Sequence, residues 1–181
     1  MLTGAVALAG CGGGAQQDAN EPSGTYKVDV VDASFPAKQR LSEPERLRIA
    51  VKNTGDRDVP DVAVTVDSFS EVSQQPGLAD PSRPVWLVDH APRGGTTAYV
   101  NTWALGRLRP GQTRTFIWRV TAIEPGQHKI RWTVSAGLNG KAQARLLGNR
   151  VPEGEFTVDV SPKPSQASVD PATGKVVRSA N

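Results

Sequence analysis

Seven segments of this 181-residue chain alternate apolar and polar residues with a period of two. In the longest of them, single polar residues separate Ile130, Trp132 and Val134. Successive side chains of a β-strand point to opposite faces, so the pattern predicts strands that are each buried on one face. The segments cover residues 26–30, 47–52, 62–67, 115–120, 128–136, 142–146 and 156–160. No stretch shows the sustained i, i+3, i+4 apolar spacing of a helix, so we expect an all-β protein.

Turn-forming residues separate these segments. Clusters rich in Gly, Pro, Asn and Asp occupy residues 53–56, 109–112, 124–127 and 138–141. Asn139-Gly140 favours a tight hairpin, because both residues tolerate positive φ. Short strands with regular turn signals predict an Ig-like antiparallel β-sandwich of about seven strands over residues 25–161.

Several of these strand and turn sequences resemble bacterial Ig-like modules of the CARDB type. The resemblance lies in Leu47–Gly55 with Val59–Val66, in Leu108–Thr113 with Phe116–Trp118, and in Gly126–Ile130. It implies an Ig-like fold and a role as an adhesion, scaffold or stalk domain on a bacterial surface, where few such modules have their own catalysis. The shared motifs are turns and strand starts, which specify fold far better than function.

Residues 1–11 form a short apolar stretch that runs into small residues, which is typical of a secretion signal. The stretch ends in Leu8-Ala9-Gly10-Cys11, which resembles the lipobox of bacterial lipoproteins. This resemblance implies cleavage before Cys11 and attachment of a diacylglycerol to its sulfur. No Lys or Arg precedes the apolar stretch, unlike the signals of that family, so we expect the natural start to lie upstream. The alternative is a free cysteine in a disordered leader.

The two ends of the chain differ in composition from the predicted sandwich. Residues 12–24 contain no large apolar side chain and predict a flexible tether. Residues 162–181 form a Pro-rich tail that we expect to be mobile, with a turn and a short extended segment over 170–177. Acyl chains on Cys11 would hold the protein stably at a membrane. We therefore expect it to be extracytoplasmic and lipid-anchored to the bacterial cell membrane.

Composition excludes several other classes. One cysteine allows neither an intramolecular disulfide nor a multi-cysteine zinc site. No apolar run approaches the ~20 residues of a transmembrane helix. A net charge of +3 without a clustered patch gives no indication of a nucleic-acid partner. No P-loop, dinucleotide fingerprint or Cys-x-x-Cys occurs, so we expect no cofactor.

Candidate residues for catalysis or metal binding are sparse. His90 follows Asp89, but no Gly-x-Ser-x-Gly elbow accompanies them, so we expect no enzymatic activity. Asp56, Asp58 and Asp61 surround one turn. Because no calcium-loop repeat is present, we interpret the three as a solvated turn rather than a calcium site, and we expect no metal.

Residues 68–110 form an insert longer than an ordinary loop, with strand candidates at 85–88 and 97–103. We expect a hairpin over residues 85–103, appended to the sandwich and turning at Pro92–Gly95. Its aromatic residues fall outside the core alternation, so one hypothesis is a ligand platform for a glycan or another small ligand. The platform residues are Trp86, His90, Arg93, Tyr99, Asn101 and Trp103. The alternative is that the aromatic residues plug one end of the sandwich.

Four basic residues occupy outward positions of strands that we expect to be neighbours. A basic stripe of this kind would suit anionic wall polymers or lipid headgroups. The alternative is a solvated sheet face whose charges prevent edge pairing. The four residues are Arg119, Lys129, Arg131 and Arg145.

The leading functional prediction is a non-enzymatic, lipid-anchored cell-surface module that binds a protein or an envelope polymer. A glycan or small-ligand receptor that uses residues 85–103 is the alternative within binding proteins. An envelope enzyme is the alternative from another class, although the sequence supplies no catalytic set for it.

Overall fold

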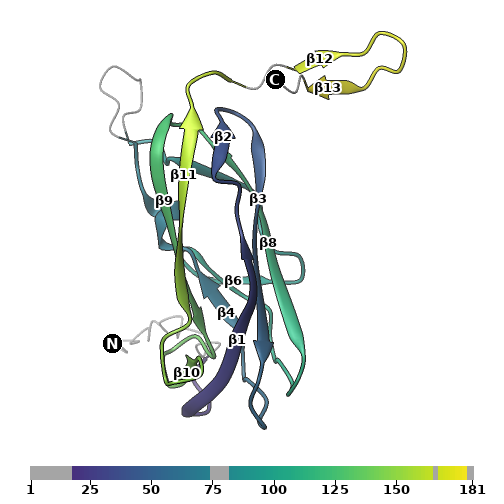
Figure 1. Ribbon diagram of the computed structural model, residues 1–181. Helices are drawn as coiled ribbons and strands as arrows, with labels where there is room; N and C mark the ends of the chain where they lie inside the picture. The colour runs from purple at the N-terminus through teal and green to yellow at the C-terminus, as the bar shows by residue number, and fades with distance from the viewer. Residues whose placement is uncertain (1–17, 74–81, 165–166, 179–181) are drawn as a thin grey trace, which may run out of the picture.

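The computed structural model describes residues 18–73, 82–164 and 167–178. Two β-sheets face each other around one core, which confirms the predicted all-β sandwich (Figure 1). The five-stranded sheet has the order β10 (Ala142–Arg145), β1 (Gly24–Ser34), β3 (Pro44–Asn53), β8 (Thr113–Ala122) and β5 (Trp86–His90). The six-stranded sheet has the order β2 (Lys38–Arg40), β11 (Glu153–Ser161), β9 (Gly126–Ser135), β4 (Ala63–Thr65), β7 (Thr102–Ala104) and β6 (Thr96–Tyr99). Within these ranges the only helical segment is the four-residue 3₁₀ turn η1 (Asp67–Ser70), so they contain no helix that is long enough to cross a bilayer.

Each of the seven alternating segments contributes a strand to the sandwich, namely β1, β3, β4, β8, β9, β10 and β11. On β3, Leu47, Ile49 and Val51 are fully buried, whereas Arg48 and Lys52 are exposed. Alternation therefore predicted correctly which residues of β3 face the core, because the strand's two-residue period is a local property of the backbone.

Aromatic side chains from both sheets meet at the centre of the core. Trp118 of β8 is completely buried and stacks on Phe116, with ring centroids 5.8 Å apart. From the facing sheet, Trp103 of β7 approaches Trp118 edge-on at 5.5 Å. Phe69 of η1 contacts both indoles, at 5.9 Å from Trp103 and 6.5 Å from Trp118. Edge-to-face and offset contacts of this kind are the favoured geometries for aromatic pairs, so these four rings hold the two sheets together.

Strand pairing differs from the purely antiparallel arrangement that we expected. β1 pairs with β10 in parallel, and β11 pairs with β2 in parallel, so both sheets are mixed. The Asn139-Gly140 hairpin prediction is wrong as well. Gly140 has the positive φ of 82°, but the chain there leaves β9 for β10, which belongs to the other sheet. Turn propensity is local, whereas the partner of the following strand depends on packing.

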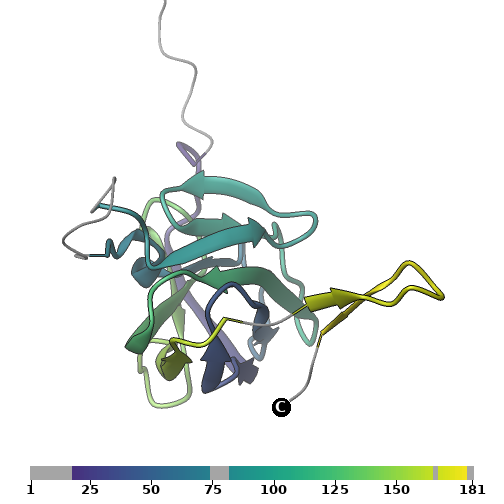
Figure 2. The same ribbon diagram turned by 90° about the horizontal axis from the view of Figure 1, so that it is seen from above.

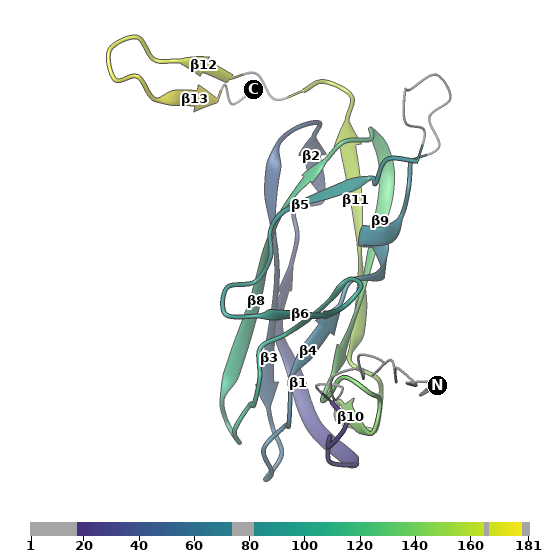
Figure 3. The same ribbon diagram turned by 180° about the vertical axis from the view of Figure 1, so that it is seen from behind.

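The predicted hairpin over residues 85–103 is also wrong. β5 pairs antiparallel with β8 in the five-stranded sheet, whereas β6 pairs with β7 in the six-stranded sheet. The segment 91–95 therefore crosses between the sheets instead of closing a hairpin (Figure 3). The hairpin that does form is β6–β7, whose turn contains Asn101 at φ 57°. Asparagine is one of the few non-glycine residues that adopt this left-handed conformation at low cost.

The C-terminal tail contains a small hairpin of its own, β12 (Ala167–Val169) and β13 (Val176–Arg178). Asp170 shapes its turn by accepting hydrogen bonds from the Ala172 N–H at 2.8 Å and the Thr173 hydroxyl at 2.9 Å. These bonds stabilise the carboxylate and lower the pKa of Asp170. The hairpin projects away from the sandwich (Figures 1 and 2).

Asn53, a buried polar residue at the end of β3, holds the loops at that end of the sandwich in place. Its amide donates to the carbonyl oxygens of Arg57 and Leu108, both at 2.8 Å. Its side-chain oxygen accepts the Gly55 N–H at 2.9 Å. One side chain thus joins the turn after β3 to the segment that precedes β8.

We predict that Asn53→Ala lowers the free energy of unfolding by about 2–4 kcal/mol. The substitution removes three hydrogen bonds from a buried side chain and leaves a cavity in place of its amide. Chemical denaturation measures the change, with Asn20→Ala at an exposed position as the control. Equal midpoints for the two variants would show that Asn53 does not hold these loops.

Candidate functional site

The residues just before β1 are bound to the sandwich by a carboxylate. We call residues 18–23 the strap. The Glu21 carboxylate accepts backbone N–H groups from Leu138, from Asn139 at 3.0 Å and from Ala142 at 2.7 Å. A Cβ atom on Gly137 would overlap this carboxylate, so glycine at this position leaves the space that the Glu21 carboxylate occupies. The sequence carries no local signal for the role of Glu21, because its partners lie 117 to 121 residues further along the chain.

Asp18 supplies the second attachment of the strap. Its backbone carbonyl accepts the side-chain amide of Asn139 at 2.6 Å, and its carboxylate accepts the Tyr99 hydroxyl at 2.8 Å. The bond to Asp18 raises the pKa of Tyr99, because the carboxylate holds the phenolic proton. Residues 18–24 of the predicted tether therefore pack on the domain, and the tether's residues 12–17 lie outside the described residues together with Cys11.

The aromatic residues of the predicted ligand platform are mostly buried in the core. Trp86 is 1% exposed and meets Phe35 edge-on at a centroid distance of 5.6 Å. Trp103 is 6% exposed and belongs to the central cluster around Trp118. Neither indole can present a face to a glycan, so the platform prediction is wrong for both. Both indoles belong to the buried core that the two sheets share.

The other four platform residues lie apart from one another. Tyr99 is half-exposed and is bound to the strap. Asn101 donates its side-chain amide to the Ser70 hydroxyl, which orders the β6–β7 turn against η1. His90 and Arg93 line a hollow beside β8 instead. The structure thus divides these four residues among three places.

The predicted basic stripe is divided as well, because its residues belong to different sheets. Arg119 lies on β8 of the five-stranded sheet, whereas Lys129 and Arg131 lie on β9 of the other. Lys129 pairs with a glutamate, Glu155, at 2.7 Å. Arg131 pairs with Glu71 at 3.0 Å. Arg145 is on β10, at one edge of the five-stranded sheet, and donates to Gln143 at 2.7 Å.

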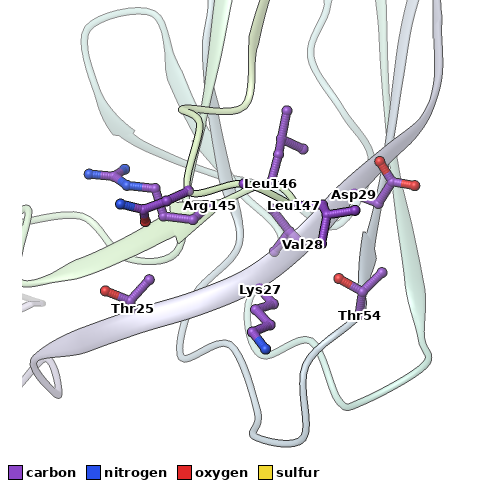
Figure 4. A pocket seen from close by; sticks show the side chains of 10 residues that line it. Thr25, Lys27, Val28, Asp29, Thr54, Arg145, Leu146 and Leu147 are labelled. Carbon is purple, nitrogen blue, oxygen red and sulfur yellow. The ribbon is translucent and has the colours of Figure 1, made fainter.

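One surface groove runs between β1 and the segment after β10 (Figure 4). Its volume is about 640 Å³. Lys27, Asp29 and Thr54 supply polar groups, and Leu146 and Leu147 supply apolar ones. Leu147 is 95% exposed, which is unusual for so large an apolar side chain. The groove could therefore receive an apolar side chain of a partner at its rim.

A second hollow lies on the outer face of the five-stranded sheet and is strongly basic. We call it the arginine cavity; its volume is about 600 Å³. It is lined by Arg46, His90, Ala91, Arg93, Thr115, Ile117 and Arg119. His90 and Arg93 were predicted as part of the ligand platform and Arg119 as part of the basic stripe, whereas Arg46 was not predicted as a site residue. Both Arg46 and Arg119 occupy outward positions of alternating strands, but only the pairing of β3 with β8 makes them neighbours.

Two of the three aspartates near the first turn, Asp58 and Asp61, have structural partners. Asp58 pairs with Arg107 at 3.5 Å. Asp61 accepts the Gly106 N–H at 2.9 Å, and partial burial raises its pKa despite this bond. Within the described residues, no group of three or more His, Cys, Asp or Glu side chains is placed to hold a metal ion.

No protein-family model and no curated protein sequence matches this chain. Among solved structures, a CARDB domain from Pyrococcus furiosus in complex with di-metal ions is similar over 77% of this chain and 93% of its own. Its sequence identity is 17% and its TM-score 0.46. An alpha-2-macroglobulin from Escherichia coli is similar over 83% of this chain but only 21% of its own, with 17% identity and a TM-score of 0.46. At these values the likenesses assign neither a family nor an activity to this chain.

Proposed function

We propose that this protein is a non-catalytic module, anchored outside the cytoplasm through a lipidated Cys11, that binds a protein or an envelope polymer. The strap is the observation that carries this proposal, because it gives the anchored end of the chain a defined place on the domain.

The distance from the anchor to the domain is short. Only residues 12–17 separate Cys11 from Asp18, where the strap begins. Seven residue steps span at most about 25 Å when fully extended. Since Glu21 is bound to the loop 137–142, a lipid on Cys11 would hold that end of the sandwich near the membrane. The strap thus supports a module of defined orientation rather than one on a long free tether.

The surfaces left for partners lie at different distances from the strap. The strap leads into β1 beside β10, at one edge of the five-stranded sheet, and the arginine cavity borders β5 at the opposite edge. The groove in Figure 4 lies beside β10, on the side of the strap. Both hollows are on one sheet, and one is partly apolar while the other is basic. This arrangement supports binding of partners at the flank of the domain.

The surroundings of the histidines support a non-catalytic role. A ring nitrogen of His128 lies 3.0 Å from the Glu124 carbonyl oxygen, and the imidazole packs edge-on against Trp86. Asp89 precedes His90, but its carboxylate accepts the Thr121 hydroxyl at 2.7 Å. A general base needs a partner that orients it, and the Asp89 carboxylate is bound to Thr121 instead.

We predict that Cys11→Ser moves the protein from the membrane fraction to the soluble fraction of its host. The serine cannot carry a thioether-linked diacylglycerol, so the acyl chains that hold the domain at the bilayer are lost. Fractionation with detection of the protein measures this, and Ser23→Ala, which leaves Cys11 intact, is the control. A Cys11→Ser protein that stays with the membranes would exclude anchoring through this residue.

We also predict that Glu21→Ala releases the strap. The backbone N–H groups of Asn139 and Ala142 lose their carboxylate partner, so their hydrogen exchange should become at least about tenfold faster. Hydrogen-exchange mass spectrometry of the 137–142 loop measures this. Glu153→Ala, at an exposed position of β11, is the control. Unchanged exchange in the Glu21 variant would mean that the strap does not order this loop.

A further inference from the structure

A row of three basic side chains crosses the outer face of the five-stranded sheet. Arg46 of β3 is the register partner of Arg119 on β8, and Arg119 is in turn the partner of His90 on β5. Directly opposed residues of antiparallel strands have Cβ atoms about 4.5–5.5 Å apart, and like charges at such positions are destabilising. The pairing of two arginines here is therefore unfavourable by itself, and an anion between them would relieve the repulsion.

The protein itself does not supply that anion among the residues that the structure describes. Arg48, one position along the same face of β3, pairs with Asp32. Within the same part of the chain no ion pair is found for Arg46, Arg93 or Arg119. Four basic residues elsewhere on the sandwich, namely Arg48, Arg107, Lys129 and Arg131, do pair with aspartates or glutamates. What sets the arginine cavity apart is that two arginines stand directly opposite each other and a third lines the same hollow.

The geometry around this row forms a receptacle rather than a flat surface. Arg93 comes from the segment 91–95, which crosses from β5 to β6 beside β8 (Figure 3). Thr115 adds a hydroxyl group to the lining, and Ile117, 42% exposed, adds an apolar wall. Three guanidinium groups and an imidazole thus border one hollow of about 600 Å³. Guanidinium groups bind phosphate and carboxylate oxygens in a bidentate manner and keep their charge at any physiological pH.

We propose that the arginine cavity binds the phosphate groups of an anionic envelope polymer. The inference deepens the proposed function and rests on it for the compartment in which the polymer is met. A phosphodiester carries one negative charge shared by two non-bridging oxygens, and several guanidinium groups can contact these oxygens at once. A polymer is favoured over a lipid headgroup because the cavity borders β5, at the sheet edge opposite β10, and the strap leads into the domain beside β10.

The test uses the full chain with Cys11→Ser, so that the protein is soluble, and labelled poly(glycerol phosphate) as the probe. Arg46→Gln and Arg119→Gln should each weaken binding by at least about tenfold, since each removes one charge-assisted contact. Arg109→Gln removes the same charge from an exposed loop at the other end of β8 and should change binding by less than about twofold. The affinity of the Cys11→Ser protein with an intact cavity for poly(glycerol phosphate) should fall steeply as the salt concentration rises.

Several outcomes would overturn the proposal. Equal affinity of the two cavity variants and Arg109→Gln would show that the cavity is not the site. Equally tight binding of neutral polyglycerol or of polyglutamate would exclude recognition of phosphate. Vesicles containing phosphatidylglycerol that bind through Arg119 more tightly than the polymer would identify a lipid surface as the ligand instead.

Stability measurements keep the test independent of folding. Removing one of two opposed like charges should leave the melting temperature of Arg119→Gln unchanged or higher, and Arg46→Gln supplies a second variant. A variant that folds but loses binding supports the proposal. Absence of polymer binding together with normal membrane anchoring of the Cys11 protein would overturn the cavity assignment alone. Failure of the anchoring test leaves the polymer measurement intact, because that measurement uses soluble protein.

Discussion

Contact between aromatic rings across the two sheets is the interaction on which this sandwich depends. Trp118 contributes from the five-stranded sheet, Trp103 from the six-stranded sheet, and Phe69 from the turn that follows β4. An indole of this size buries about 150–250 Å², which corresponds to about 4–6 kcal/mol at ~25 cal/mol per Å². Because the chain's single cysteine allows no intramolecular disulfide, packing of this kind must supply the stability.

Polar side chains position the loops around that core by satisfying backbone groups. Asn53 binds two carbonyl oxygens, and Glu21 binds three backbone N–H groups. Each joins segments far apart in sequence, so loop geometry and the place of the N-terminal strap follow from the assembled fold. The arginine cavity differs, because the basic groups of Arg46 and Arg119 oppose each other there without such a partner in the described residues. The proposal that this surface binds an external anion rests on that opposition and on the hollow that the two side chains line.

Prediction from the sequence succeeded where the signal is local and failed where it depends on pairing. The alternation in residues 47–52 and 128–136 identified β3 and β9, because a two-residue period is a property of the strand itself. Trp86 and Trp103 were candidates for a surface platform because they lie outside any clean alternation, yet both are buried. Trp86 lies on β5 and Trp103 on β7, and both strands are short. Each indole is buried against the facing sheet, so no alternation along its own strand could have predicted the burial.

The sequence by itself determined the all-β class, the main strands and the residues of those strands that face the core. It also contains the Leu8-Ala9-Gly10-Cys11 motif, from which anchoring through Cys11 is predicted. Only the tertiary structure decided which charged residues are neighbours. Arg119 was expected beside Lys129, but Lys129 belongs to the six-stranded sheet. Arg119 lies instead beside Arg46 in the five-stranded sheet. The physical reason is that the period of a strand sets the face on which a side chain lies, whereas the neighbours on that face depend on strand order and register, which long-range packing selects.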